Sequence, residues 1–573
     1  RHSGAGYPRD RRYQRDAGHP PGVPLPFMWT TVSLLLLLAL AIFGRFYRLP
    51  TVPPEMSSDH VEKLLDVNTI LSGEYPIFFE RNTGREPMQF YVIAAIIYLF
   101  DTGLTFISLK LSNAVMGVLT VVGVYLLGRE VGGHRLGWLA GFFSAVAMWA
   151  VAPSRIGLRY PFAPAFTALA LWSLLRALRT SRRNDWLIAG VLLGMGLHGY
   201  TAFRMMPVVA VLIVLLKVLL DRPYSRARAL DVGRNFALYV LVSLLVFLPL
   251  GHYMVELPDM FWSRSLTRST SLERSITESP LRLLGYTIAR TLGQFNWVGD
   301  EVFVVALRRV PVLDVVSGGL LILGVAYTLF VLLRRRPFLA LVLLTGVFLL
   351  LMPSALNIAF PSESPSTVRS GGAIPIIALL VALALNYLYE QVRELLPGER
   401  GRIGSALLLS GLLLTMGLSN YNRYFGRYLD EYRQINMNSV EVASRMKDYL
   451  SIVGDPDHMA YKGWPYWLDA RALGIQLGAL DWSRYHASMT LDPLLANAPD
   501  DGQPLLFVLH PEDTLSLEQL EAFYPVGAAI TYRSTTPGHD FVFFLVPARR
   551  NLEYQPHTPG PWTPDVYYFN APP

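Results

Sequence analysis

The segment Ser57-Ser58-Asp59-His60-Val61-Glu62 contains the residue types best suited to acid–base chemistry. Apolar residues follow it at helical spacing, so we expect an amphipathic helix to begin here. A carboxylate at the start of such a helix can remove the proton from the hydroxyl group of an acceptor while the hydroxyl oxygen attacks a sugar carbon. Asp59 is therefore the candidate general base, and His60 and Glu62 are candidate substrate-binding residues beside it.

Two other interpretations of this segment stay open. Asp59 is a good N-cap, and Glu62, three residues later, would complete a capping box. Asp59, His60 and Glu62 could instead bind a divalent metal, but three ligands within four residues do not converge on one face of a helix. A metal is the less favoured alternative, and no cofactor is expected.

Gly84-Arg85-Glu86-Pro87 follows in the same stretch of chain, and Pro87 suits the first turn of a further helix. Arg85 is a candidate donor to a phosphate group, and Glu86 is a candidate acceptor for a substrate hydroxyl. The alternative is that the two side chains simply pair with each other.

Arginine residues also recur between later apolar runs. A guanidinium group there could bind the phosphate of a lipid, whereas the alternative is that each side chain only reaches toward the lipid headgroups. Two of them are four residues apart, and like charges on one helix face would repel unless an anion lies between them. The candidate phosphate-binding residues are Arg155, Arg159, Arg204, Arg264 and Arg369.

Two aromatic segments are further binding candidates. Gln294 to Glu301 combines polar and aromatic side chains that suit a sugar or an acceptor, with Asp300 as the candidate substrate-binding residue, although an ordinary turn explains it equally well. Trp464-Pro465-Tyr466-Trp467 could stack on a sugar ring or a peptide, but such clusters in small domains more often belong to a core.

Composition indicates the kind of element that must position these residues. Of the 573 residues, 52% are hydrophobic and only 16% are charged, with a mean hydropathy of +0.34, which indicates a polytopic α-helical membrane protein. The net charge of +7 does not indicate nucleic-acid binding, because the basic residues cluster between apolar runs as in cytoplasmic loops. The chain has no cysteine, which excludes thiolate catalysis and Cys-based zinc sites.

About eleven apolar runs are long enough to span a bilayer, and Arg clusters that we expect to be cytoplasmic alternate between them. This alternation requires that Pro87 to Phe100, which is too short to cross, forms an interfacial or re-entrant helix within a large first outer loop, residues 48–108. The expected spans lie near Phe27–Tyr47, Leu109–Leu127, Leu136–Ala152, Phe162–Leu178, Trp186–Tyr200, Met205–Leu220, Phe236–Tyr253, Val312–Leu333, Phe338–Met352, Ala373–Tyr389 and Ile403–Leu418.

The chain is expected to have three parts. Residues 1–26 should be a disordered cytoplasmic tail, residues 27–419 the membrane domain, and residues 420–573 a small extracytoplasmic α/β domain. The elements expected in the last part are strands Leu505–Leu509, Ala528–Tyr532 and Phe541–Val546, and a helix from Ser516 to Tyr524 with Ser516 and Gln519 as its capping pair.

The order of these motifs resembles the GT-C superfamily, specifically the protein mannosyltransferase and aminoarabinose transferase group, glycosyltransferase family 39 and its bacterial relatives. The resemblance extends from Phe27 to about Leu418. It departs from the family where His60 follows Asp59 in place of a frequent acidic pair, and where Gly157 to Arg159 replaces a common acid. The matching segments are Ser58-Asp59-His60, Gly84-Arg85-Glu86-Pro87, Leu109-Lys110-Leu111-Ser112-Asn113-Ala114, Ser154-Arg155-Ile156-Gly157-Leu158-Arg159 and Pro365-Ser366-Thr367-Val368-Arg369.

The resemblance implies an inverting transferase that moves a hexose or pentose from a polyprenyl-phosphate donor to a lipid, glycan or protein acceptor, at the outer face of a bacterial plasma membrane. Asp59 would activate the acceptor while arginines stabilise the leaving phosphate. A transporter or lipid-moving protein is one alternative, but it predicts ionisable residues deep inside the spans, whereas here the charge gathers at one surface. A catalytically silent scaffold subunit of a membrane complex is the other.

Overall fold

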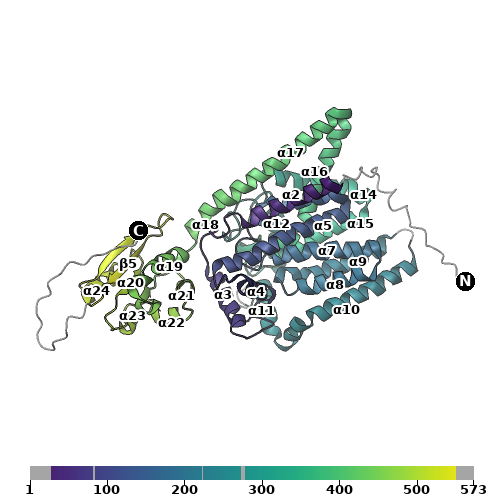
Figure 1. The fold of residues 1–573 in the computed structure, drawn as a ribbon. Coiled ribbons are helices and arrows are strands. Elements are labelled where there is room, and N and C mark those ends of the chain that lie inside the picture. Colours follow the sequence, from purple (N-terminus) through teal and green to yellow (C-terminus); the bar gives the residue numbers. More distant parts are fainter. Residues whose placement is uncertain (1–26, 82–83, 222–223, 273–275, 277, 550–573) are drawn as a thin grey trace, which may run out of the picture.

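The computed structural model describes residues 27–81, 84–221, 224–272, 276 and 278–549. The expected cytoplasmic tail, residues 1–26, and the end of the C-terminal domain, residues 550–573, lie outside the described residues. The described chain forms a bundle of long helices beside a small domain that contains a sheet (Figure 1). The fold class expected from the sequence is confirmed.

Eight helices of the described chain are long and apolar enough to cross a membrane, and each of the eleven expected runs lies largely on a helix. The two numbers differ for two reasons. One helix, α5, joins two runs at Gly132 and Gly133, whose φ/ψ values are not helical, and α7 and α8 are too short or too polar to count. The bundle helices are α2 (Phe27–Phe46), α5 (Phe106–Val146), α7 (Phe162–Thr180), α8 (Arg183–Gly196), α9 (Met206–Leu220), α10 (Arg226–Glu256), α13 (Val315–Tyr327), α15 (Pro337–Ala355), α16 (Ile374–Leu395) and α17 (Gly398–Asn422).

The bundle core lies around α16, whose first twelve residues, 374–385, are all buried. A helix that is apolar on every face must be surrounded by other elements, and α16 packs against α5, α13 and α17. On α10, by contrast, Leu244, Leu245 and Leu248 are 57–62% exposed. Apolar surface of this kind is costly in water, so it faces the lipid of the bilayer.

Three shorter helices lie at the end of the bundle next to the sheet domain (Figure 1): α3 (Ser58–Leu71), α4 (Met88–Phe100) and α11 (Pro258–Ser269). A fourth, α12 (Pro280–Gly293), packs against α15. The thirteen residues of α4 are too few to cross a bilayer, and the helix packs on α3 and α5, while α11 follows directly from α10 (Figure 1). The helices α3 and α11 and the turn before α4 carry residues of the candidate site.

The bundle connects to the sheet domain through a continuous helical segment. After α17, the chain stays helical through η5 (Arg423–Tyr428) and α18 (Leu429–Ile435), so the sheet domain begins beyond the boundary expected at residue 419. The next helix, α19 (Ser439–Asp448), starts against the first loop of the bundle. There the carboxylate of Glu55 accepts hydrogen bonds from the backbone N–H groups of Val440 and Glu441, at 2.6 and 3.1 Å.

The C-terminal sheet has the order β2-β1-β3-β5-β4, in which β1 pairs parallel with β2 and β3 and the other pairs are antiparallel. Its strands are β1 (Met459–Lys462), β2 (Ala487–Ser488), β3 (Leu505–Leu509), β4 (Ala528–Tyr532) and β5 (Phe541–Val546). The last three have the expected bounds. The helix α24 (Thr514–Phe523) starts earlier than expected, because Asp513 caps it by accepting the N–H of Ser516 at 3.2 Å. The predicted capping pair is therefore wrong.

Candidate functional site

Helix α3 begins with a capping arrangement that the sequence did not predict. Ser57 is the N-cap, and its backbone N–H donates to Nδ1 of His60 at 2.8 Å. Asp59 lies inside the first turn of α3. The predicted capping box of Asp59 and Glu62 is therefore wrong, and the carboxylate of Asp59 contacts other parts of the chain instead.

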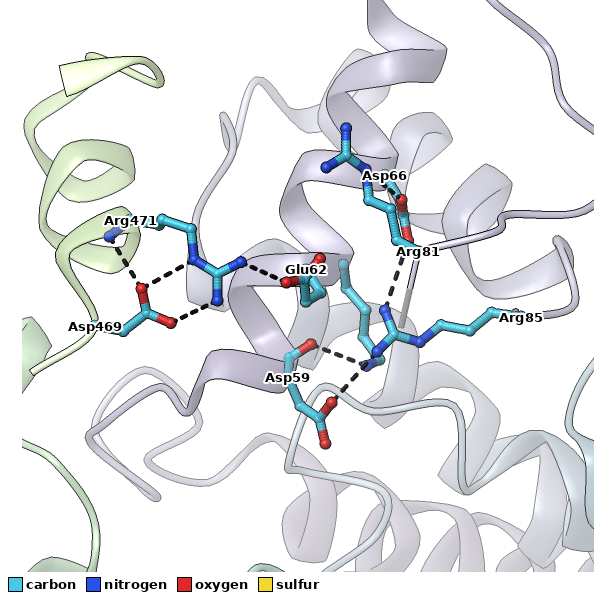
Figure 2. Close-up of polar contacts among 8 residues, drawn as sticks. Asp59, Glu62, Asp66, Arg81, Arg85, Asp469 and Arg471 are labelled. Carbon is cyan, nitrogen blue, oxygen red and sulfur yellow. Dashed lines mark hydrogen bonds and ion pairs between the residues drawn. The ribbon is translucent and has the colours of Figure 1, made fainter. Parts of the chain in front are cut away.

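Asp59, Lys63 and Asp66 lie on one face of α3, since they are four and seven residues apart. Arg85 joins the two acids: its Nη2 atom lies 3.3 Å from Oδ1 of Asp59, and its Nη1 atom lies 3.6 Å from Oδ2 of Asp66. Figure 2 shows Arg85 between the two acids. Lys63 donates from Nζ to the backbone oxygen of Asp59 at 2.9 Å. The Arg85 side chain is 1% exposed and that of Asp66 2%, whereas the Asp59 side chain is 47% exposed. Asp59 is thus the acid of this group that a substrate can reach.

The charges around Asp59 keep it ionised. Burial acts to raise the pKa of Asp59, but Lys63, Arg85 and Arg264 outweigh burial and hold the pKa below its ordinary value. Burial raises the pKa of Asp66 to about 6 despite Arg85. At neutral pH, Asp59 is therefore a carboxylate that can accept a proton and that has a buried cation behind it.

A tight turn aims Arg85 at α3. Arg85 and Phe79 form an isolated antiparallel bridge, with N–H to oxygen distances of 2.7 and 3.0 Å. Gly84, just before Arg85, has φ +83°, and a Cβ atom there would come within 2.5 Å of the Phe78 ring. Only glycine fits this turn without moving Phe78.

Replacing Gly84 with Ala is therefore expected to displace Arg85 and to lower activity more than tenfold, because Asp59 loses its buried partner. The matched control is Gly73→Ala, since Gly73 has a similar φ of +93° but no atom within 4 Å of the added Cβ. Both variants carry backbone strain, and only the first carries the clash. Equal activities in a transfer assay would contradict the role given to this turn.

Glu86 is the centre of a buried ionic cluster. Its carboxylate accepts from Nη1 of Arg159 at 2.5 Å, from Nη2 of Arg204 at 3.0 Å and from the hydroxyl of Thr201 at 2.9 Å. Burial acts to raise the pKa of Glu86, but Arg159 and Arg204 hold it below its ordinary value. Glu86 is 1% exposed. It therefore fixes the first loop to two later connections, and it does not pair with Arg85.

Arg155 and His60, both predicted to contact substrate, are buried inside the protein. The turn that holds Arg155 and Arg159 is not helical, so the two side chains do not share a helix face. The prediction that an anion lies between them is therefore wrong. His60 donates from Nε2 to the oxygen of Ile156 at 2.6 Å, and burial lowers its pKa to about 3, so the ring is neutral. Arg155 donates to the backbone oxygens of Gly44, Arg45, Tyr47 and Val52, at 3.1, 2.8, 2.7 and 3.2 Å.

Asp300 and Glu62 also bind protein groups. Asp300 is 1% exposed and accepts from the backbone N–H and the hydroxyl of Thr367, at 2.7 and 2.9 Å, so it fixes the loop that carries Arg369. Glu62 pairs with Arg471 of the C-terminal domain (Figure 2). No three His, Asp or Glu side chains in the described part of the chain are placed to hold a metal ion.

Of the predicted phosphate-binding residues, Arg264 and Arg369 keep N–H groups that donate to no other group among the described residues. Arg264, on α11, is half-buried and has no hydrogen bond or ion pair within the described residues. Arg369 pairs through Nη2 with Glu363 at 2.8 Å, while its buried Nη1 atom has no hydrogen-bond partner among the described residues. Arg159 lies over the ring of Tyr200, with its Cζ atom 5.8 Å from the ring centroid. Arg264 acts to lower the pKa of Asp59.

Sequence reasoning missed Lys63 and Asp66, the two groups that share the face of α3 with Asp59. Their spacing of four and seven residues from Asp59 was visible in the sequence. It also missed Tyr200, the N-cap residue of η1 (Thr201–Met205), for which the sequence holds no signal, because only the fold brings its ring near Arg159.

Comparisons with known proteins give a family match and a fold. Residues 84–253 match the family model described as dolichyl-phosphate-mannose-protein mannosyltransferase. No curated protein matches the sequence. The fold is similar to that of ArnT from Cupriavidus metallidurans in the complex with undecaprenyl phosphate, with 16% identity and a TM-score of 0.51, over 90% of this chain and 98% of that chain. The apo form of ArnT gives 15% identity and the same TM-score, over 91% and 99%.

A weaker likeness connects the chain to the oligosaccharyltransferase of Archaeoglobus fulgidus. The identity is 17% and the TM-score 0.47, over 73% of this chain and 58% of that chain. This chain thus spans little more than half the length of the archaeal protein. At such identities, the likeness to ArnT establishes the fold alone.

Proposed function

We propose that this chain, a membrane protein of the GT-C superfamily by its fold and its family match, is an inverting glycosyltransferase. It would move a sugar from a polyprenyl-phosphate donor to the hydroxyl of a lipid, glycan or protein acceptor. The observation that carries the proposal is a half-exposed, ionised carboxylate, Asp59, with buried Arg85 behind it. Arg264, whose guanidinium has no ion pair among the residues that the structure describes, acts on the same carboxylate.

In the proposed reaction, the acceptor oxygen attacks the anomeric carbon from the face opposite the phosphate. The new carbon–oxygen bond forms as the bond from the sugar to the phosphate breaks, and the electron pair of that bond goes to the phosphate oxygen. Asp59 takes the acceptor proton. Arg264 and Arg369 stabilise the phosphate as its negative charge grows, and Arg85 keeps Asp59 ionised and fixed in place. The proposed mechanism uses no metal ion and no nucleotide.

We also propose that the site lies at the outer face of a bacterial plasma membrane, with the N-terminus in the cytoplasm. The Arg clusters of the short connections support this orientation, because cytoplasmic loops are enriched in such residues. Arg334, Arg335 and Arg336, for example, join α13 and α15 at the end of the bundle remote from the sheet domain (Figure 1).

Replacing Arg264 with Gln is expected to raise the KM for the lipid donor by about tenfold to a hundredfold, because a charge-assisted contact to phosphate is lost. The same change also removes a cation that holds the pKa of Asp59 low. Without this cation the pKa of Asp59 should rise, so Asp59 becomes protonated at a higher pH. As the pH falls, the variant should therefore lose activity at a higher pH than the wild type does.

The matched control is Arg282→Gln, on exposed α12, where the side chain is 82% exposed. This variant should keep both the KM and the pH profile of the wild type. An unchanged donor KM in Arg264→Gln would remove that residue from the proposed phosphate site.

The proposed function itself is tested by incubating the purified protein with undecaprenyl-phosphate hexoses and pentoses. Release of undecaprenyl phosphate and formation of a glycosylated acceptor are expected for at least one sugar. Movement of lipid across vesicle membranes without cleavage of the sugar–phosphate bond would favour a lipid transporter instead.

A further inference from the structure

The carboxyl ends of β1 and β3 form a second candidate site, in the C-terminal domain. In the sheet, β2 lies on one side of the neighbouring strands β1 and β3, and β4 lies on the other side. The connections that follow β1 and β3 therefore run in opposite directions. Loops that diverge from neighbouring parallel strands leave a crevice at the strand ends, where ligands bind in open α/β sheets. The segments at these ends are Gly463 to Trp467 after β1 and His510 to Asp513 after β3.

Three aromatic side chains meet at these strand ends, Trp464, Trp467 and His510, and Tyr466 lies between the two tryptophans in the sequence. We call these four residues the aromatic platform. The rings of Trp464 and His510 are stacked, with centroids 5.0 Å apart and planes 2° apart, and Trp467 meets His510 edge-on at 84°. Tyr466 is 100% exposed. Its φ of +57° is a conformation that bulky residues rarely adopt. This backbone holds a large phenol in water, where it covers no core of its own.

Polar groups lie at the base of the platform. The ammonium group of Lys462 lies 3.0 Å from Oδ2 of Asp513, and both side chains are at most 10% exposed. Trp467 is 9% exposed, and its indole N–H has no hydrogen-bond acceptor in the part of the chain that the structure describes. A buried donor without an acceptor is costly, and a ligand oxygen would satisfy it.

The platform is also near Asp59. Asp469 pairs with Arg471 at 2.9 Å, and Arg471 also pairs with Glu62 on α3, next to Asp59 (Figure 2). Tyr466 precedes Asp469 by three residues, so their Cα atoms are at most about 11 Å apart. An acceptor of a few sugar units could therefore contact the platform while its hydroxyl lies at Asp59.

We propose that the aromatic platform is a binding subsite for a glycan acceptor, which makes a carbohydrate the acceptor class of this enzyme. The proposal rests on the proposed function. A pyranose ring presents weakly positive C–H groups that pack on the face of an aromatic ring, and hydroxyl groups at its edge that need the donors and acceptors found here. A peptide held by strand addition would need an open sheet edge, and the platform lies at the strand ends instead.

The test measures the binding of mannopentaose, arabinopentaose and maltopentaose to the full-length protein in detergent micelles, by saturation-transfer NMR. At least one of them should bind, and Tyr466→Ala should weaken it about tenfold, since one stacking contact is lost. Tyr466 covers no core, so this variant should fold. The matched control is Tyr485→Ala, an exposed tyrosine on α22 (Trp482–His486) of the same domain, which should bind as the wild type does.

Three results would overturn the subsite: none of the three sugars binds, Tyr466→Ala binds sugar as the wild type does, or a Ser- and Thr-containing peptide binds where the sugars do not. In transfer assays, Tyr466→Ala should raise the acceptor KM and leave donor affinity and kcat unchanged. Glycan binding needs no catalysis, so a wild-type protein that binds glycan but transfers no sugar would overturn the proposed function and not the subsite.

Discussion

Replacing Asp59 with Asn is expected to lower kcat for sugar transfer by about a thousandfold, because the amide has nearly the shape of the carboxylate but cannot accept the proton. Donor affinity should change little, since the phosphate is assigned to Arg264 and Arg369. The measurement is transfer of radiolabelled sugar from the lipid donor, with donor binding followed separately. A drop in kcat without a change in donor affinity would assign Asp59 to the chemical step.

The sharpest control is Asp66→Asn, which makes the same chemical change on the same face of α3 and also removes a partner of Arg85. Asp66 is 2% exposed and out of reach of substrate, so we expect at most about a tenfold loss. If the Asp66 variant were the more damaged of the two, Asp66 would be the base and the assignment to Asp59 would be wrong.

Replacing Glu86 with Ala is expected to destabilise the protein by about 3–5 kcal/mol, because two arginine side chains lose their shared carboxylate in a buried position. Arg159 is 3% exposed and Arg204 17%, so neither can regain full hydration without moving. The midpoint of thermal unfolding in one detergent should fall, and the loop that carries Arg85 should loosen with it.

Glu80→Ala is the matched control for this experiment. Glu80 lies in the same loop and accepts the hydroxyl of Tyr253 at 2.9 Å, but this contact is exposed, so the free energy of unfolding should change by less than about 0.5 kcal/mol. Equal unfolding midpoints for the two variants would show that the Glu86 cluster does not hold the loop.

Much of the fold follows from the sequence because one physical rule governs each part of it. Long apolar runs must be helical in a bilayer, and each of them is. In the sheet domain, β3, β4 and β5 have clear apolar patterns, and their predicted bounds are right. The strand β1 was missed because its four residues are too few for a pattern.

The candidate site was only partly predictable, because a polar residue at a loop has the same sequence signal whether it binds substrate or protein. Asp300 binds Thr367, and Arg155 donates to the hydroxyl of Tyr424, 269 positions later, at 3.1 Å. Such partners arise only when the chain folds. A mannosyltransferase family model matches residues 84–253, and the fold is similar to that of ArnT. The motifs that carry the resemblance nevertheless include both exposed residues and residues that bind only other parts of the protein.

If the proposed function is right, Asp59 and Arg264 share one site with the phosphate of a lipid donor. A cryo-EM structure of the full chain with undecaprenyl phosphate tests this placement. We expect density for the phosphate within ion-pair distance of Arg264, with the carboxylate of Asp59 facing the same space. A phosphate bound at the opposite end of the bundle, near Arg334 to Arg336, would show that the site is wrongly assigned.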